Sequence, residues 1–225
     1  MKSKKPLGFL LSLFLVAVVS VSAIYADAPF SKKEIAAGFD KIQANLEHAK
    51  NLKTNVVAEG NGVQISMEDF IFYKGSLELS NSLQTDKSAA AATKLSDQQI
   101  VENLISTALT AKRATELGLT VSDEEIDMVI AKEREALQMK NDPDNDMVRE
   151  LMTNRIRITG LTEDEFYSSD YVRNKYAESI LIGKLYDKLH DEKTINDMQD
   201  FLQYKQNLFK AGKTSVSINN QELGD

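Results

Sequence analysis

The sequence predicts a mainly α-helical, multi-helix domain with a small two- to three-stranded sheet. At four places a Ser or Thr stands three residues before an acidic or amide residue, the pattern of a helix N-terminal capping box, led by Ser66, Ser96, Ser122 and Thr162. Apolar residues then recur at spacings of three and four, as on one face of a helix. Only 7% of residues are aromatic and only ten of the 225 are Gly, which favours helices over a sandwich of short strands.

The N-terminal segment predicts export from the cytoplasm. Lys2, Lys4 and Lys5 precede an uncharged apolar run from Leu7 to Ile24. Such a run serves equally as a cleaved signal peptide or as an uncleaved membrane anchor, so both remain open for residues 1–28. We therefore expect the rest of the chain to be extracytoplasmic, either secreted or held at a membrane through Leu7 to Ile24.

Residues 29–53 predict an amphipathic helix from Ser31 to about Leu52. Ile35, Phe39 and Ile42 lie on its apolar face. The pattern does not distinguish a stalk between membrane and domain from a helix that packs on the body.

The sheet is predicted from both ends of residues 54–218. Two short β-favouring runs flank Asn61-Gly62, a dipeptide that suits a tight hairpin turn. A lone hairpin is marginal in water, so the alternating segment Thr214–Ile218 is expected to pair with it. Residues 219–225 form a polar tail.

Helices fill the chain between these strands, from Ser66 and over about 96–117, 122–137, 147–158, 162–167, 170–189 and 194–210. Residues 84–94 predict a flexible connection. We expect Ile100, Leu104, Thr107, Ala108, Ala111 and Ala114 to face inward on the second of these helices. On the last, Ile195, Met198, Leu202, Leu208 and Phe209 are expected inside.

Composition excludes several kinds of chemistry. A formal charge of −7 argues against nucleic acid as a partner, and the absence of Cys excludes disulfides and thiol nucleophiles. His48 and His190 are far apart and lie in polar stretches. The acidic run Asp142–Asp146 lacks the Gly and Glu that a calcium loop requires at its sixth and twelfth positions. We predict no catalytic residue, no metal ligand and no cofactor.

Three segments carry a family resemblance: Val56–Phe70, Ile105–Ile126 and Gly160–Phe166, the last followed by a long helix to Leu189. Their order resembles the N-terminal chaperone domain of the SurA and PrsA family of exported parvulin-type foldases. In that family an isomerase domain usually follows the long helix, whereas here the chain passes from Leu189 to Ile195 straight into the last helix. The lipidated Cys typical of PrsA-like proteins is also absent. The resemblance implies a SurA N-terminal-like chaperone domain without the parvulin isomerase.

Apolar and aromatic surface is then the candidate for function. Tyrosine and methionine suit adaptable binding of many sequences. The peptide-binding candidates are Phe70, Tyr73, Phe166, Tyr167, Tyr171, Tyr176 and Tyr204, with Tyr167 and Tyr171 as the preferred anchors; membership of the core remains the alternative for each ring. We expect an ATP-independent protein that holds unfolded or partly folded exported polypeptides. An envelope scaffold that binds one specific partner is the alternative.

Overall fold

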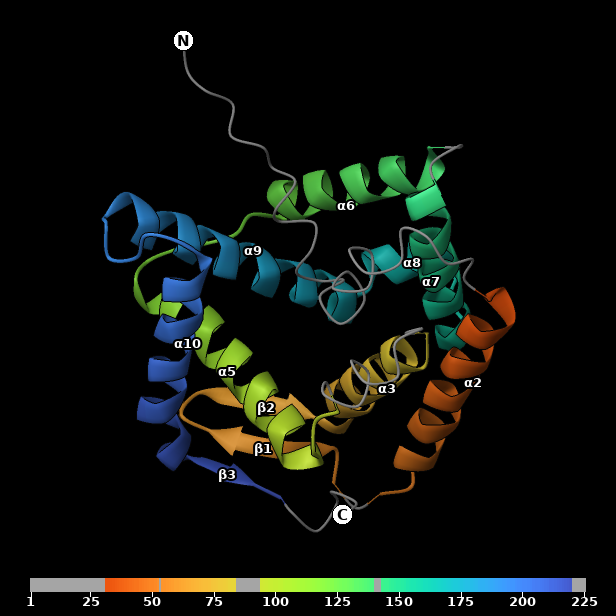
Figure 1. The fold of residues 1–225 in the computed structure, drawn as a ribbon, viewed down its shortest axis with the longest axis horizontal. Helices are drawn as coiled ribbons and strands as arrows, with labels where there is room; N and C mark the ends of the chain where they lie inside the picture. The colour runs from red at the N-terminus through yellow and green to blue at the C-terminus, as the bar shows by residue number, and fades with distance from the viewer. Residues whose placement is uncertain (1–30, 53, 84–93, 140–142, 220–225) are drawn as a thin grey trace.

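The computed structural model describes residues 31–52, 54–83, 94–139 and 143–219. Within these, the elements in order are α2 (Lys32–Ala49), β1 (Val56–Gly60), β2 (Val63–Ser66), α3 (Met67–Leu83), α5 (Asp97–Glu116), α6 (Asp123–Gln138), α7 (Pro143–Thr159), α8 (Glu163–Ser168), α9 (Asp170–Asp191), α10 (Met198–Gly212), η2 (Lys213–Ser215) and β3 (Val216–Ile218). Figure 1 shows them as a ring: α9 and α6 at the top, α7 and α2 on one side, α5 and α10 on the other, and the sheet at the base. The expected fold class, mainly helical with a small sheet, is confirmed.

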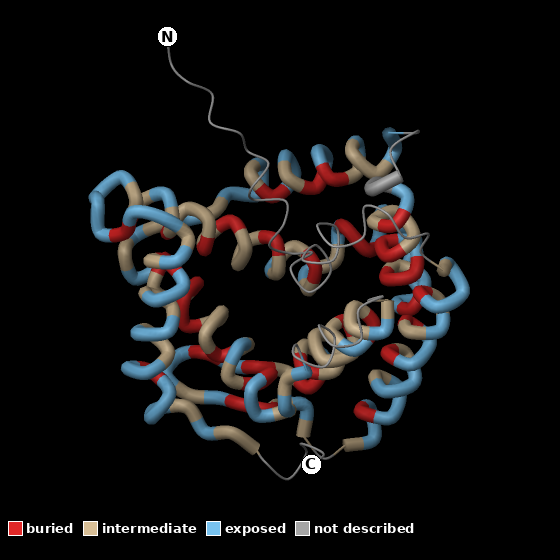
Figure 2. The backbone as a smooth tube through the Cα atoms, in the orientation of Figure 1, coloured by how far each residue is buried: buried red, intermediate tan, exposed pale blue. Residues whose placement is uncertain are grey.

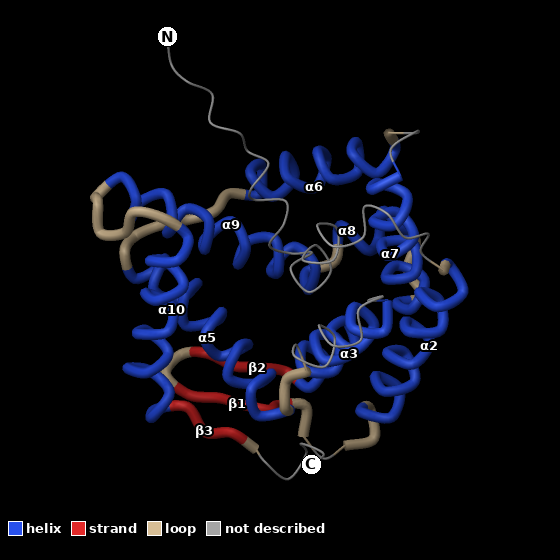
Figure 3. Tube along the Cα trace, viewed as in Figure 1, coloured by secondary structure: helices blue, strands red, loops and turns tan. Residues whose placement is uncertain are grey.

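The sheet joins the two ends of the domain as expected. Asn61 and Gly62 both have positive φ, 49° and 72°, which is the geometry of the type I′ hairpin turn. β1 pairs antiparallel with both β2 and β3, so the strand order is β2-β1-β3. The closing strand β3, which Figure 3 shows beside β1, is shorter than predicted, because residues 213–215 form a 3₁₀ turn before it.

Side-chain caps set the starts of most helices. Complete capping boxes stand at Ser96, Ser122 and Thr162. At α3 the Ser66 hydroxyl accepts from the Asp69 backbone N–H at 3.0 Å and donates to the Asp69 carboxylate at 2.8 Å. Each predicted helix start of this kind is therefore confirmed.

Helix α2 packs on the body of the domain. Its Ile35, Phe39 and Ile42 are buried against α3 and α7. The approach to α3 is close, because a Cβ at Gly75 would lie 2.3 Å from Ile42 Cγ1. Figure 2 shows this inner face of α2 buried and its outer face exposed.

Three helices differ from the sequence prediction. Helix α7 begins at Pro143 rather than near residue 147, because proline suits the first helical position. On α5 the fully buried residues include Val101, Ile105 and Leu109, whereas Leu104, Thr107 and Ala108 are half-buried. This follows from its neighbours, since α5 packs against α3 and the hairpin as well as α9 and α10.

Helix α10 begins at Met198, later than predicted, because Asp197 caps it. Leu202, predicted to lie inside, is 51% exposed. The one-face pattern placed Leu202 with Met198, but the helix turns its Phe201 side to the core instead.

Several predictions fall outside the described residues: the export segment 1–28, most of the 84–94 connection and the tail beyond Asn219. Among the helices of the described ranges, none is long and apolar enough to cross a membrane.

Candidate functional site

Two neighbouring cavities, called here the larger and the smaller lobe, lie inside the ring of helices. The larger lobe, about 650 Å³, lies between α2, α3, α7 and the start of α9. The smaller lobe, about 460 Å³, lies between α3, α5, α9 and α10. Phe72, Arg155 and Tyr171 line both lobes, so we treat the two as one central cavity.

The shared wall is held by a buried cation among aromatic rings. The Arg155 guanidinium lies 4.5 Å from the ring centre of Phe72 and 5.6 Å from that of Phe166. Only 8% of Arg155 is exposed, and this burial lowers the pKa of its guanidinium. Stacking of this kind fixes three elements, α3, α7 and α8, around one side chain.

A second polar junction ties α9 to α3 between the lobes. The Tyr171 hydroxyl donates to Asp69 Oδ1 at 3.0 Å, and Lys175 Nζ lies 2.7 Å from the same oxygen. Burial raises the pKa of Tyr171 far above its ordinary value, with the charge of Asp69 as the next cause. Tyr171 therefore remains a neutral donor, and its ring forms apolar wall in both lobes.

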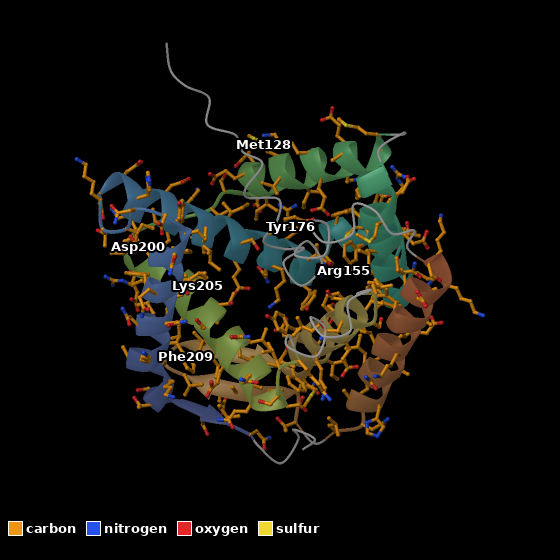
Figure 4. The ribbon with its side chains drawn as sticks, in the orientation of Figure 1. Met128, Arg155, Tyr176, Asp200, Lys205 and Phe209 are labelled. Atoms are coloured by element: carbon orange, nitrogen blue, oxygen red, sulfur yellow. The ribbon has the colours of Figure 1, made fainter. Side chains whose placement is uncertain are left out.

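Exposed apolar side chains occur at the cavity. In the described part of the chain, four large apolar side chains are more than a third exposed: Met128, Met139, Leu161 and Leu202. Leu161, 40% exposed, lines the larger lobe, and Leu202 lines the smaller. Met128 lies on α6, and Met139 directly follows the last residue of α6. Neither lines a lobe, and Figure 4 labels Met128.

Comparison with protein families decides the identity of this fold. The family model of the SurA-like N-terminal domain matches residues 8–182. The chain belongs to this family. The scan finds no parvulin isomerase domain beside the SurA-like match. Searches of curated proteins and of solved structures give no match.

In the SurA-like domain, three of the seven peptide-binding candidates line the cavity and four do not. Phe166 and Tyr171 line the larger lobe, and Tyr73 and Tyr171 line the smaller. Phe70, Tyr167, Tyr176 and Tyr204 line neither lobe. Phe70, Phe166, Tyr167 and Tyr176 are each at most 5% exposed, whereas Tyr73, Tyr171 and Tyr204 are half-buried.

The rings outside the cavity have structural partners. Tyr167 donates to Glu133 at 3.2 Å inside the core formed by α6, α7, α8 and α9. Tyr204 stacks on Phe201 with ring centres 6.4 Å apart. Of the two preferred anchors, Tyr171 therefore lies at the cavity and Tyr167 in the core beside it.

Sequence reasoning missed Arg155, Leu161 and Phe72 as cavity residues. A signal existed for Phe72, because it lies off the Phe70 and Tyr73 face of α3. Nothing in the sequence marks Arg155, which follows ordinary helical residues in a polar helix. Elsewhere His48 is exposed and His190 lies against Tyr186, and no group of three His, Asp or Glu within the described ranges could hold a metal ion.

Proposed function

We propose that this SurA-like protein is an extracytoplasmic, ATP-independent chaperone that holds unfolded or partly folded exported polypeptides, without isomerase activity. The central cavity carries this proposal. It combines apolar walls, with Leu161 and Leu202 open to solvent, and polar groups that can serve an extended backbone.

Apolar burial suits clients of varied sequence. An unfolded chain always exposes some apolar groups, whereas it offers few fixed side chains for hydrogen bonds. Each aliphatic side chain removed from water contributes about 1.5–3 kcal/mol at full burial, before losses of motion are subtracted. Asn103, Ser106 and Thr107 on α5 line the smaller lobe and can exchange hydrogen bonds with a client's backbone.

Export is the second part of the proposal. Lys2, Lys4 and Lys5 before the run Leu7 to Ile24 support a location outside the cytoplasm. The mass of the native N-terminus distinguishes the cleaved from the anchored form. A mature chain that begins near Ala23 supports secretion, whereas an intact N-terminus in the membrane fraction supports anchoring.

Suppression of aggregation tests the holding activity. We expect the double variant Leu161→Gln, Leu202→Gln to protect a chemically unfolded client markedly less than the parent, because two apolar contacts become polar. Both positions are exposed, so the melting temperature should change little. The matched control is Met128→Gln, Met139→Gln, which changes the other two exposed apolar side chains.

Light scattering during the aggregation of two unrelated clients measures the protection that each protein gives. Equal loss of protection in both double variants would show that general surface hydrophobicity acts, not the cavity. If the parent protects neither client but retains one partner from an envelope extract, the scaffold alternative replaces the chaperone proposal.

A further inference from the structure

We infer that the smaller lobe contains a subsite, centred on Lys205, for a carboxylate of the bound polypeptide. This inference rests on the proposed function and adds a chemical preference to it. The carboxylate could be the C-terminus of a client or an acidic side chain.

Lys205 is a half-buried cation without a direct partner. It lies on α10 and lines the smaller lobe. Figure 4 shows it on the opposite side of the ring of helices from Arg155. Among the residues that the structure describes, it makes no hydrogen bond or ion pair, and only the charge of Glu178 acts on it from a distance. Burial lowers the pKa of its ammonium group accordingly.

The other charges of the lobe are already engaged. Lys175 contacts Asp69 at 2.7 Å and Glu178 at 3.7 Å. Arg155 is stacked between aromatic rings. Three cations and two acids line this lobe, so one positive charge exceeds the described anions.

A ligand carboxylate would balance that charge. The wall of this lobe includes Leu104, Ile182 and Leu202, which lower its polarity and strengthen attraction between opposite charges. A hydrogen bond between an ammonium and a carboxylate is about twice as strong as a neutral one. The side chain of Gln206 in the same lobe can donate to the second carboxylate oxygen.

Binding of one fluorescent peptide in three forms tests the subsite. The peptide consists of Leu, Val, Ser and Thr, and carries either a free C-terminal carboxylate, an amidated C-terminus with an internal Glu, or an amidated C-terminus with Gln in its place. The proteins are the full chain and its variants Lys205→Met and Lys205→Arg. Lys210→Met is the matched control, because Lys210 is exposed on the same helix and outside the lobe.

We expect the full chain to bind at least one carboxylate form about tenfold more tightly than the Gln form. Lys205→Met should abolish this difference, whereas Lys205→Arg and Lys210→Met should keep it. A preference for the free C-terminus alone identifies the chain end as the ligand, and a preference for both forms identifies any carboxylate.

Other outcomes separate this inference from the proposed function. Equal binding of all three forms would overturn the subsite and leave the chaperone proposal standing. A carboxylate preference that survives Lys205→Met would overturn the assignment to Lys205. A folded parent that binds none of the peptides would overturn both.

Discussion

Glu133 is the most completely buried acidic side chain in the described chain, and its surroundings link three helices. It lies on α6 with 3% exposure and accepts a hydrogen bond from Tyr167 of α8 at 3.2 Å. Burial raises the pKa of Glu133, whereas Tyr176, Tyr167 and the positive charge of Arg155 oppose that rise. The net direction is upward, so the folded protein holds this proton more readily than the unfolded chain.

This direction predicts a pH dependence of stability. Because the folded pKa is raised, the free energy of unfolding falls as pH rises from about 4.5 through the folded pKa. Glu133→Gln keeps an acceptor for Tyr167 but cannot ionise. We expect the variant to be as stable as the parent in acid and more stable at neutral pH.

Urea unfolding at several pH values measures the difference. Glu133→Leu, which removes the acceptor, is the control and should be less stable than the Gln variant throughout. A Gln variant that is less stable than the parent at neutral pH would mean that attraction to Arg155 outweighs burial.

Some residue roles depend on neighbours in the sequence, and others depend on how the helices pack. The caps at Ser96, Ser122 and Thr162, and the turn at Asn61-Gly62, depend on neighbours in sequence and were predictable. Burial of a given tyrosine was not, because a ring at helical spacing suits either core or surface. Tyr171 and Tyr176 illustrate this: they lie five residues apart on α9, one at the cavity and one fully buried.

At the scale of elements, β3 closes the domain with only three residues. Val216 and Ile218 pack on the same core cluster as the hairpin, and Asn219 N–H donates to Val57 O at 2.8 Å. The contact is close at Gly60, where a Cβ would lie 2.2 Å from Ser215 O. Removing β3 therefore uncovers one edge of β1 and part of its core.

Deletion of residues 213–225 should lower the melting temperature. Two half-buried aliphatic side chains contribute on the order of 2 kcal/mol, which corresponds to roughly 4–8 °C for a chain of this size. Circular dichroism melting gives the measurement. A chain that ends at Asn219 retains β3 and is the control; if both truncations melt with the parent, β3 does not contribute to stability.

Elements were predictable where their own sequence determines them. The hairpin, the helix starts at the capping boxes and the pairing of the closing strand followed from turn residues, caps and the need of a hairpin for a third strand. The inward faces of α5 and α10 were less predictable. Helix α5 has neighbours on several sides, and the phase of α10 depends on Phe201 packing against Tyr186 with ring centres 5.3 Å apart.

At the scale of the whole molecule, the central cavity depends on how separate elements are arranged. Its shared wall takes Phe72 from α3, Arg155 from α7 and Tyr171 from α9. These residues are distant in sequence, and no periodicity relates them. The sequence could therefore predict an aromatic-rich surface for clients, but not a cavity or its two lobes.

The two lobes should act as one site for a long client. Because the chain has no Cys, Leu161→Cys and Leu202→Cys each create a single labelling position, one in each lobe. An environment-sensitive dye at either position should shift its emission to shorter wavelength when a long unfolded client displaces water from the lobe.

The same dye at Met128→Cys, on α6 outside the cavity, is the control and should not respond. A short peptide with no charged group should compete with the client at both positions, because Phe72, Arg155 and Tyr171 line both lobes. If a client shifts the dye at Leu161 but never at Leu202, binding is confined to the larger lobe and the wall of Phe72, Arg155 and Tyr171 is a barrier. If the Met128 dye responds as strongly as the other two, clients bind the outer surface of the ring of helices.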